Sequence, residues 1–228
     1  MKTERDLELE KRAAAETAAR LVEDGMRVGL GTGSTVALLL PALAARGLDI
    51  RCVATSLETE QLARELGLSV EPFGTLDRLD IAIDGADQIA PDGWLVKGGG
   101  GAHTREKIVA AAADRFVVIA SSDKVVETLS PPVPLELLAF GLAATLRALG
   151  SAAVRGGPAS PDGGVIADYL GPVADPAALA SRLGATPGVV EHGLFPPELV
   201  AEILVARGPE IERARPPLVG AERVLPRS

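Results

Sequence analysis

The chain has 228 residues, of which 47% are hydrophobic and 24% charged, and its formal net charge is -8. This composition is typical of a soluble globular protein with enough apolar material for one large domain and one smaller one. The acidic balance argues against a nucleic-acid-binding protein, which needs a concentrated basic surface. It does not argue against a small anionic ligand, which backbone amides and one or two lysines can hold.

Membrane, export and metal signals are missing from the sequence. No apolar run approaches the roughly 18 residues that a membrane-spanning helix needs, and the charged residues 1–6 do not resemble a secretory signal. The lone Cys52 and the two histidines leave no intrachain disulfide and no Cys/His metal cluster. We therefore expect a cytoplasmic protein without a metal or a membrane partner.

The first half of the chain alternates helical and strand patterns. Thr3 is placed to cap an amphipathic helix over residues 4–23, and Gly25 is placed to end it. An apolar strand over residues 26–31 then runs through a glycine turn into a helix with Ser34 as its predicted N-cap. The elements predicted next are strand 49–54, helix 57–66, strands 68–73 and 79–83, helix 104–113 and strand 115–120. This alternation predicts an α/β protein with a mostly parallel sheet and helices on both faces.

The pattern changes at residues 130–134, where three prolines in four residues cannot continue a central strand or a helix interior. The elements predicted beyond this point are helix 137–149, strands 152–155 and 165–170, helix 175–183, and strands 188–195 and 201–205. This mixture predicts a small α+β lobe with an antiparallel sheet. We expect one domain from residues 1–130 plus 205–228 and a lobe from residues 131–204. The tail after Gly208 carries no recognisable motif.

The glycine turn after the first strand is a candidate phosphate site. Its sequence, Gly29-Leu-Gly-Thr-Gly-Ser-Thr35, offers backbone amides and three hydroxyls at the positive end of a helix. It is not the dinucleotide-binding fingerprint, which has glycine where Ser34 stands, nor is it a P-loop, because no Gly-Lys-Ser/Thr closes it. A tight strand-to-helix turn without a ligand is the alternative interpretation.

Acidic residues and a lysine gather around a second glycine-rich stretch. Asp84 and Asp87 follow the strand 79–83, at the edge where open α/β sheets bind ligands, although Asp/Gly turns are also common for structural reasons. Lys97 opens a run of four glycines. Each glycine in regular structure lowers the stability of a protein by about 1 kcal/mol relative to alanine, because it loses more conformational entropy on folding. A run of four is therefore better explained by a close approach of the backbone to a ligand.

Two further charged residues follow the glycine run. Glu106 lies in the first turn of the predicted helix, where a carboxylate also complements the helix dipole. Lys124 follows the strand 115–120 at the same sheet edge, as a solvated lysine or an anion contact. A base, an acid, a cation and bare amides together are what proton transfer beside a carbonyl requires.

Four segments together resemble the ribose-5-phosphate isomerase family of the A type. The resemblance covers roughly residues 11–205. The segments are Gly29-Leu-Gly-Thr-Gly-Ser-Thr35, Asp84-Gly-Ala-Asp87, Lys97-Gly-Gly-Gly-Gly-Ala-His-Thr-Arg-Glu-Lys107 and Pro187-Gly-Val-Val-Glu-His-Gly-Leu-Phe195.

The resemblance implies an aldose-ketose isomerase of the non-oxidative pentose phosphate pathway. Such an enzyme interconverts D-ribose 5-phosphate and D-ribulose 5-phosphate through an enediolate. The resemblance further implies a Rossmann-like large domain, a ferredoxin-like small lobe and no cofactor. It implies a homodimer or homotetramer whose partner is a small phosphorylated sugar.

Site residues follow from the resemblance position by position. It implies that Glu106 is the catalytic base and that Asp84, Asp87 and Lys97 line the substrate site. For such a reaction we expect Asp84 to handle the protons of ring opening with Asp87 orienting or sharing, and Lys97 to stabilise the negative oxygen. The residues implied to bind the substrate are Lys11, Thr32, Gly33, Ser34, Thr35, Gly85, Ala86, Gly98, Gly99, Gly100 and Lys124.

The sequence departs from the family pattern in two places and leaves two other functions open. Gln88 stands where the family has glutamate, and Ser160-Pro-Asp-Gly-Gly replaces a Thr-Asp-Asn-Gly turn. A non-catalytic sugar-phosphate sensor would use the same turn but would not need Glu106. A related hydrolase, lactonase or deaminase would favour a histidine, and His103 lies close to Glu106 in the sequence.

Overall fold

The computed structural model describes residues 2–76, 78–217 and 222–224. None of the helices in these ranges is long and apolar enough to cross a membrane. The α-helices are α1 Glu4–Ala19, α2 Ser34–Ala44, α3 Leu57–Glu65, α4 His103–Ala111, α5 Leu142–Leu149 and α6 Pro176–Gly184. The short 3₁₀ helices are η1 Phe73–Thr75, η2 Ser122–Lys124 and η3 Pro197–Leu199.

The larger sheet is mostly parallel. Its strands are β1 Arg27–Leu30, β2 Arg51–Ala54, β3 Ser69–Val70, β4 Ile81–Asp84, β7 Phe116–Ser121, β13 Glu202–Arg207, β14 Glu210–Ala214 and β15 Glu222–Val224. They follow the order β15-β14-β13-β7-β4-β1-β2-β3, and only β14 and β15 at one edge pair antiparallel. The predicted Rossmann-like sheet is thus confirmed, and the tail after Gly208 adds strands to it.

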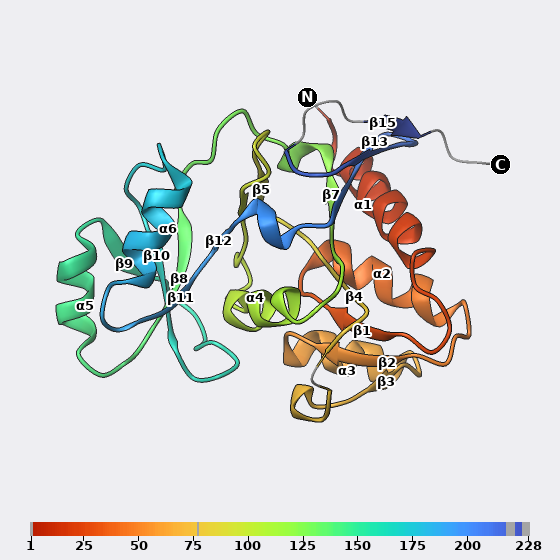
Figure 1. The fold of residues 1–228 in the computed structure, drawn as a ribbon, viewed down its shortest axis with the longest axis horizontal. Coiled ribbons are helices and arrows are strands. Elements are labelled where there is room, and N and C mark those ends of the chain that lie inside the picture. Colours follow the sequence, from red (N-terminus) through yellow and green to blue (C-terminus); the bar gives the residue numbers. More distant parts are fainter. Residues whose placement is uncertain (1, 77, 218–221, 225–228) are drawn as a thin grey trace.

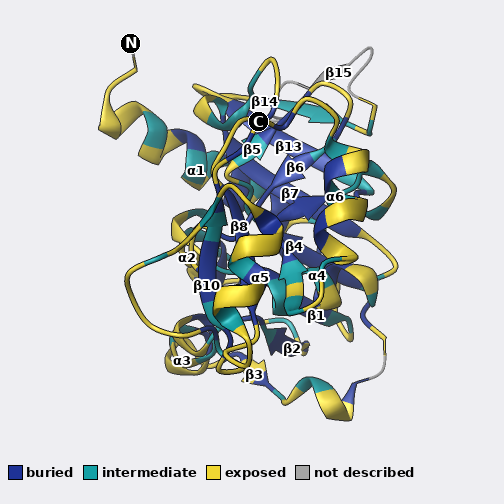
Figure 2. Ribbon diagram, turned by 90° about the vertical axis from the view of Figure 1, so that its left-hand side faces the viewer, coloured by how far each residue is buried: buried dark blue, intermediate teal, exposed yellow. Residues whose placement is uncertain are grey.

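Successive side chains along each strand point to opposite faces of the sheet, where they contribute to two separate hydrophobic cores. On β4, Ile81 and Ile83 pack against α1, α2 and α3, whereas Ala82 points to the opposite face and packs near Val109 of α4. Helices therefore cover both faces, as an open parallel sheet requires. Figure 2 shows the result: the central strands β4 and β7 are buried, and the helices expose their outer faces.

A smaller antiparallel sheet forms the second lobe. Its strands are β8 Val133–Leu137, β9 Ala152–Val154, β10 Val165–Tyr169 and β11 Val189–His192. The chain order β8-α5-β9-β10-α6-β11 and the spatial order β11-β8-β10-β9 are those of a ferredoxin-like fold. The predicted small lobe is confirmed in type, and the division of the chain at residues 130 and 205 stays a prediction.

Helix α4 lies between the two lobes (Figure 1) and contacts β4 of the large sheet as well as β8 and β11 of the small one. A third sheet lies beside it, with the order β12-β6-β5. Its strands are β5 Gln88–Ile89, β6 Leu95–Val96 and β12 Leu194–Phe195. Strands β5 and β6 were not predicted, because two residues are too short to show a period.

Two predicted helix ends are wrong. The first helix ends at Ala19 rather than at residue 23, and the guanidinium of Arg46 binds the carbonyls of Ala19 and Val22 at this end. Ser34 is the first residue of α2 and not its N-cap. Gly33 takes that position with φ 107°, a left-handed conformation that favours glycine.

The predicted helix over residues 137–149 is half wrong, because residues 133–137 form β8 and the helix begins at Leu142. Pro134 lies in this central strand, against the sequence expectation. Pairing of β8 with β11 begins only at Leu135, and the carbonyl of Pro134 accepts from the amide of Gly193 at 2.7 Å. The predicted strand 188–195 is also divided at Gly193, because β11 and β12 belong to different sheets.

The buried strand β7 gives a test of the core. Ile119 is fully buried, and Ile119→Ala is expected to lower the free energy of unfolding by about 2 to 5 kcal/mol through lost contacts and the cavity left behind. Ile108→Ala is the matched control, since Ile108 is 52% exposed and its truncation should cost less than about 1 kcal/mol. Urea unfolding measures both, and equal losses would contradict the assigned register.

Candidate active site

A pocket of about 160 Å³ lies where the strands β1, β4, β6 and β7 end. Ligands of open α/β sheets bind at this carboxyl edge. The pocket is lined by Thr32, Gly33, Ser34, Thr35, Gly85, Ala86, Asp87, Lys97, Gly98, Gly99, Gly100, Glu106 and Lys124. The structure thus brings together nearly all of the residues singled out in the sequence.

The turn before α2 presents the beginning of that helix to the pocket. The first amides of a helix have no partner within it and carry its positive dipole end, which suits a phosphate. The turn is held by hydroxyls from outside: Thr59 Oγ1 donates to the carbonyl of Gly31 at 2.9 Å, and Thr55 Oγ1 lies 2.8 Å from Thr32 Oγ1. Neither threonine was predicted, because both come from the segment around α3.

Three buried charged side chains meet beneath the pocket. Asp84 ends β4, Lys97 follows β6 and Glu106 lies in the first turn of α4; all three are at most 4% exposed. The Lys97 ammonium lies 2.9 Å from Asp84 Oδ2 and 3.2 Å from Glu106 Oε2, and it donates to the carbonyl of Gly85 at 2.6 Å. The cation is therefore shared between two carboxylates.

The other carboxylate oxygen of Asp84 binds the backbone of the pocket wall. Asp84 Oδ1 accepts from the amide of Thr32 at 3.1 Å and from that of Gly85 at 2.7 Å. The approach is so close that a Cβ on Gly31 would lie 1.9 Å from Asp84 Cγ. Asp84 lies behind the pocket lining and connects the turn before α2 to Lys97.

Burial and neighbouring charges change the proton affinities of these groups. Burial, with the nearby charge of Asp84, raises the pKa of Glu106 to about 8, although Lys97 opposes the change. Burial also raises the pKa of Asp84 against the same opposing effect. Burial lowers the pKa of Lys97, but the carboxylates of Asp84 and Glu106 outweigh it and raise this pKa above its usual value. Lys97 stays charged, whereas Glu106 is a carboxyl group that can change its protonation state near neutral pH.

The glycine run packs closely against protein groups as well as lining the pocket. Gly98 has φ 101°, and a Cβ there would lie 2.7 Å from the His103 ring. The amide of Gly99 donates to Asp87 Oδ2 at 2.8 Å, and a Cβ on Gly99 would meet the same carboxylate at 2.9 Å. Gly98 and Gly99 are therefore required by their protein neighbours, and not only by the approach of a ligand that was expected for the run.

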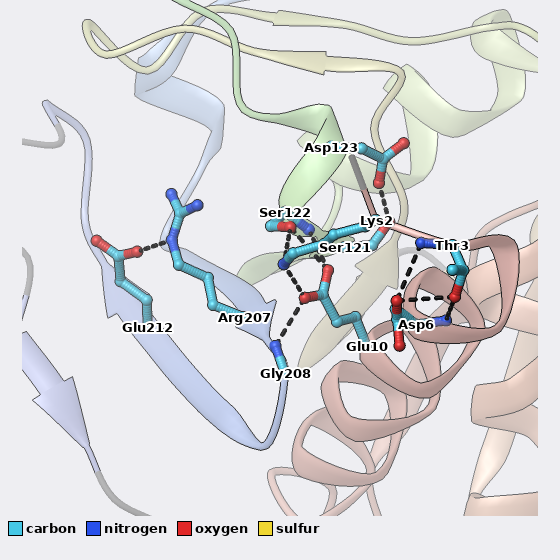
Figure 3. Close-up of polar contacts among 10 residues, drawn as sticks. All are labelled: Lys2, Thr3, Asp6, Glu10, Ser121, Ser122, Asp123, Arg207, Gly208 and Glu212. Carbon is cyan, nitrogen blue, oxygen red and sulfur yellow. Dashed lines mark hydrogen bonds and ion pairs between the residues drawn. The ribbon is translucent and has the colours of Figure 1, made fainter.

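Lys124 lines the pocket from η2, and a buried carboxylate holds this short helix (Figure 3). Glu10 of α1 accepts from the Ser122 amide at 3.0 Å, the Ser122 hydroxyl at 2.8 Å and the Gly208 amide at 2.6 Å, and it also binds the ammonium of Lys2. Burial raises the pKa of Glu10, but these hydrogen bonds outweigh it and lower the pKa to about 2. This role of Glu10 could not be predicted, because Ser122 and Gly208 lie 112 and 198 residues away from it in the chain.

The structure places two other singled-out residues outside the pocket. Lys11 does not line it, and its ammonium lies 3.8 Å from a Glu8 oxygen; its contact with a phosphate stays a prediction. His103 is fully buried and also does not line it. Burial and the charge of Lys107 lower the pKa of His103 to about 4, so its ring is neutral near pH 7. No observation favours the histidine-dependent hydrolase.

Gln88, which stands where the family pattern has glutamate, makes two hydrogen bonds to the backbone of Ser130. Its amide nitrogen donates to the carbonyl of Ser130 at 2.8 Å, and its oxygen accepts from the Ser130 amide at 2.8 Å. An ionised glutamate has no donor for the first of these bonds. Gln88 therefore fastens β5 to the segment that leads into the small lobe.

No group of three or more metal-ligating side chains occurs among residues 2–76, 78–217 and 222–224. The candidate site is thus described by its carboxylates, its lysines and its backbone amides.

The chain as a whole is similar to known proteins of one family. The family model for ribose 5-phosphate isomerase A (phosphoriboisomerase A) matches residues 51–209. A ribose-5-phosphate isomerase A of Natronomonas pharaonis is 50% identical over 224 residues, covering 90% of this chain and 96% of the relative. A solved ribose 5-phosphate isomerase A of Neisseria gonorrhoeae is 31% identical with a TM-score of 0.86, covering 90% and 96% of the two chains. A D-ribose-5-phosphate isomerase in complex with phospho-erythronic acid has the same TM-score at 32% identity, covering 92% and 99%.

The contact between Gly31 and Asp84 gives a test of the site geometry. Gly31→Ala is expected to lower the free energy of unfolding by about 1 to 3 kcal/mol, because the added methyl group forces the Asp84 carboxylate away from its amide donors. Gly74→Ala is the control, since a Cβ there meets nothing within 4 Å. If thermal and urea unfolding show the Gly31 variant as stable as the Gly74 variant, the described packing of Asp84 is wrong.

Proposed function

This chain belongs to the ribose 5-phosphate isomerase A family, and on that premise we propose how its pocket interconverts D-ribose 5-phosphate and D-ribulose 5-phosphate. The protein is an aldose-ketose isomerase: the reaction moves a proton between C2 and C1 of the open-chain sugar. The observation that carries the proposed mechanism is Glu106, a carboxyl group that lines the pocket, is 4% exposed and has a pKa raised to about 8.

The phosphate of the substrate binds at the beginning of α2. Thr32, Gly33, Ser34 and Thr35 line the pocket there, and Lys124 lines it from η2. Phosphate binding at one end fixes the distance to the reacting carbons at the other. Such positioning converts part of the binding energy into correct orientation for the chemical step.

Asp84 and Asp87 together carry out the opening of the sugar ring. It requires that a proton leave the C1 hydroxyl and that one reach the ring oxygen. Asp87 lines the pocket and is oriented by the Gly99 amide, so it is the member of the pair next to the sugar. Asp84 stands behind it and fixes Lys97.

Glu106 takes the proton from C2 and returns it to C1, while the proton of the C2 hydroxyl passes to the C1 oxygen and C2 becomes the carbonyl carbon of the ketose. The electron pair of the broken C–H bond moves into the C1–C2 bond, and the carbonyl oxygen becomes the negative oxygen of the enediolate. Lys97 and the amides of the glycine run stabilise this oxygen, where one preorganised donor is typically worth about 3 to 4 kcal/mol. Proton transfer by a positioned base typically contributes about two to four orders of magnitude.

A raised pKa suits Glu106 to this role. A base works only in its ionised form, so activity should rise with pH as the carboxyl group loses its proton. A pKa near the working pH combines a usable fraction of carboxylate with a strong driving force for taking the proton from carbon. A sensor that only bound the sugar phosphate would gain nothing from burying this carboxyl group.

We further propose that the protein acts in the cytoplasm, in the non-oxidative pentose phosphate pathway, as a homodimer or homotetramer. Exposed apolar side chains on the small lobe support self-association: Phe140 is 92% exposed and Leu138 is 52% exposed. The division into residues 1–130 plus 205–228 and a lobe of residues 131–204 is part of the same proposal.

Replacing the base tests the mechanism. Glu106→Gln keeps the size of the side chain but cannot accept the C2 proton, so both isomerisation and exchange of this proton with D₂O should fall by about 10² to 10⁴. Glu58→Gln is the matched control, because Glu58 is an exposed carboxylate in the first turn of α3. Wild-type exchange in the Glu106 variant, measured by NMR without added metal, would show that another group is the base.

A further inference from the structure

Arg155 reaches from the small lobe to the glycine run of the active site. It follows β9 directly, and its side chain is 26% exposed. Nη1 donates to the carbonyls of Gly98 and Gly99 at 3.2 and 2.9 Å.

Asp168 holds the guanidinium in place. From β10, its carboxylate accepts from Arg155 Nε at 3.0 Å and from Nη2 at 2.5 Å. A bidentate pair of this kind fixes the plane of the guanidinium as well as its position. The bidentate pair with Asp168 therefore orients the guanidinium so that Nη1 points at the two carbonyls.

The two carbonyls belong to peptide groups that link residues of the pocket lining. The carbonyl of Gly98 shares its peptide plane with the amide of Gly99, which holds Asp87, and the carbonyl of Gly99 shares its plane with the amide of Gly100. Gly99 and Gly100 both line the pocket. A cationic donor on a carbonyl fixes the plane of the peptide and polarises it, which strengthens the N–H on the other side.

We propose that Arg155 is a positioning residue for the reaction: it aims and polarises the amides that hold Asp87 and stabilise the enediolate oxygen. This inference rests on the proposed function of the glycine run. It makes the small lobe part of the catalytic apparatus, because the guanidinium that binds these two carbonyls comes from that lobe.

A second arginine provides a matched control. Arg105 of α4 also joins the two lobes, through Nε and Nη2 to the carboxylate of Asp162 at 2.8 and 2.7 Å. Its other described hydrogen bond goes to the carbonyl of Pro161 and not to the glycine run. Loss of Arg105 removes a tie between the lobes and leaves the active-site peptides untouched.

The test compares Arg155→Ala, Arg155→Lys and Arg105→Ala with the wild type in ribose 5-phosphate isomerisation. Arg155→Ala should lower kcat by about 10- to 100-fold, less than the loss of a direct oxyanion donor, and change KM by less than about threefold. Arg155→Lys should recover only part of kcat, because an ammonium cannot hold Asp168 in a bidentate pair while bridging two carbonyls. Arg105→Ala should keep kcat within about twofold.

Three results would overturn the role of Arg155: an unchanged kcat in Arg155→Ala, a loss found only in KM, or an equal fall of kcat in Arg105→Ala. Circular dichroism and urea unfolding of each variant show whether it is folded, and Arg155→Lys supplies the comparison if the alanine variant is not. A wild-type protein that did not isomerise ribose 5-phosphate would contradict the proposed function instead. An active wild type with unchanged Arg155 variants contradicts only this inference.

Discussion

The ammonium of Lys97, shared between the carboxylates of Asp84 and Glu106, is the interaction on which the active site depends. Two carboxylates and one cation buried together leave one negative charge without a partner, and a low-dielectric environment disfavours that charge. A proton bound to the carboxylate pair removes it, which is why the pKa of Glu106 rises to about 8. The buried cluster thus raises the pKa of the base Glu106 and keeps Lys97 charged, so that its ammonium can stabilise the negative oxygen.

The fold serves to hold these three groups at their distances. Asp84 ends a buried parallel strand, Glu106 begins the helix between the lobes, and the amide of Lys97 donates to the carbonyl of Gly193 at 2.8 Å. Gly193 must be a glycine, because a Cβ there would lie 2.1 Å from the Lys97 carbonyl oxygen. Both lobes therefore contribute to the geometry of the cation, and the site is not a property of the large sheet alone.

Sequence reasoning found the groups that lie in short motifs and missed those that depend on the tertiary fold. The motifs at residues 29–35 and 84–107, with the family resemblance that they carry, predicted most of the residues that line the pocket. They could not predict Glu10, whose partners lie 112 and 198 residues away, or Arg155, which contacts a loop 56 residues earlier. The prediction for residues 133–137 was wrong because proline, which has no N–H to donate, argues against a central strand. Pro134 is tolerated in β8 because the pairing of β8 with β11 begins only at Leu135.

A carboxyl ¹³C NMR titration of the free protein tests the central claim most directly. With Glu106→Gln used to assign the signal, the account predicts that the Glu106 carboxyl stays protonated at pH 6 and loses its proton with an apparent pKa of about 8. The titration should be coupled to that of Asp84, because the two carboxylates share Lys97. A Glu106 signal that titrates near the ordinary value of 4.5 would contradict the account.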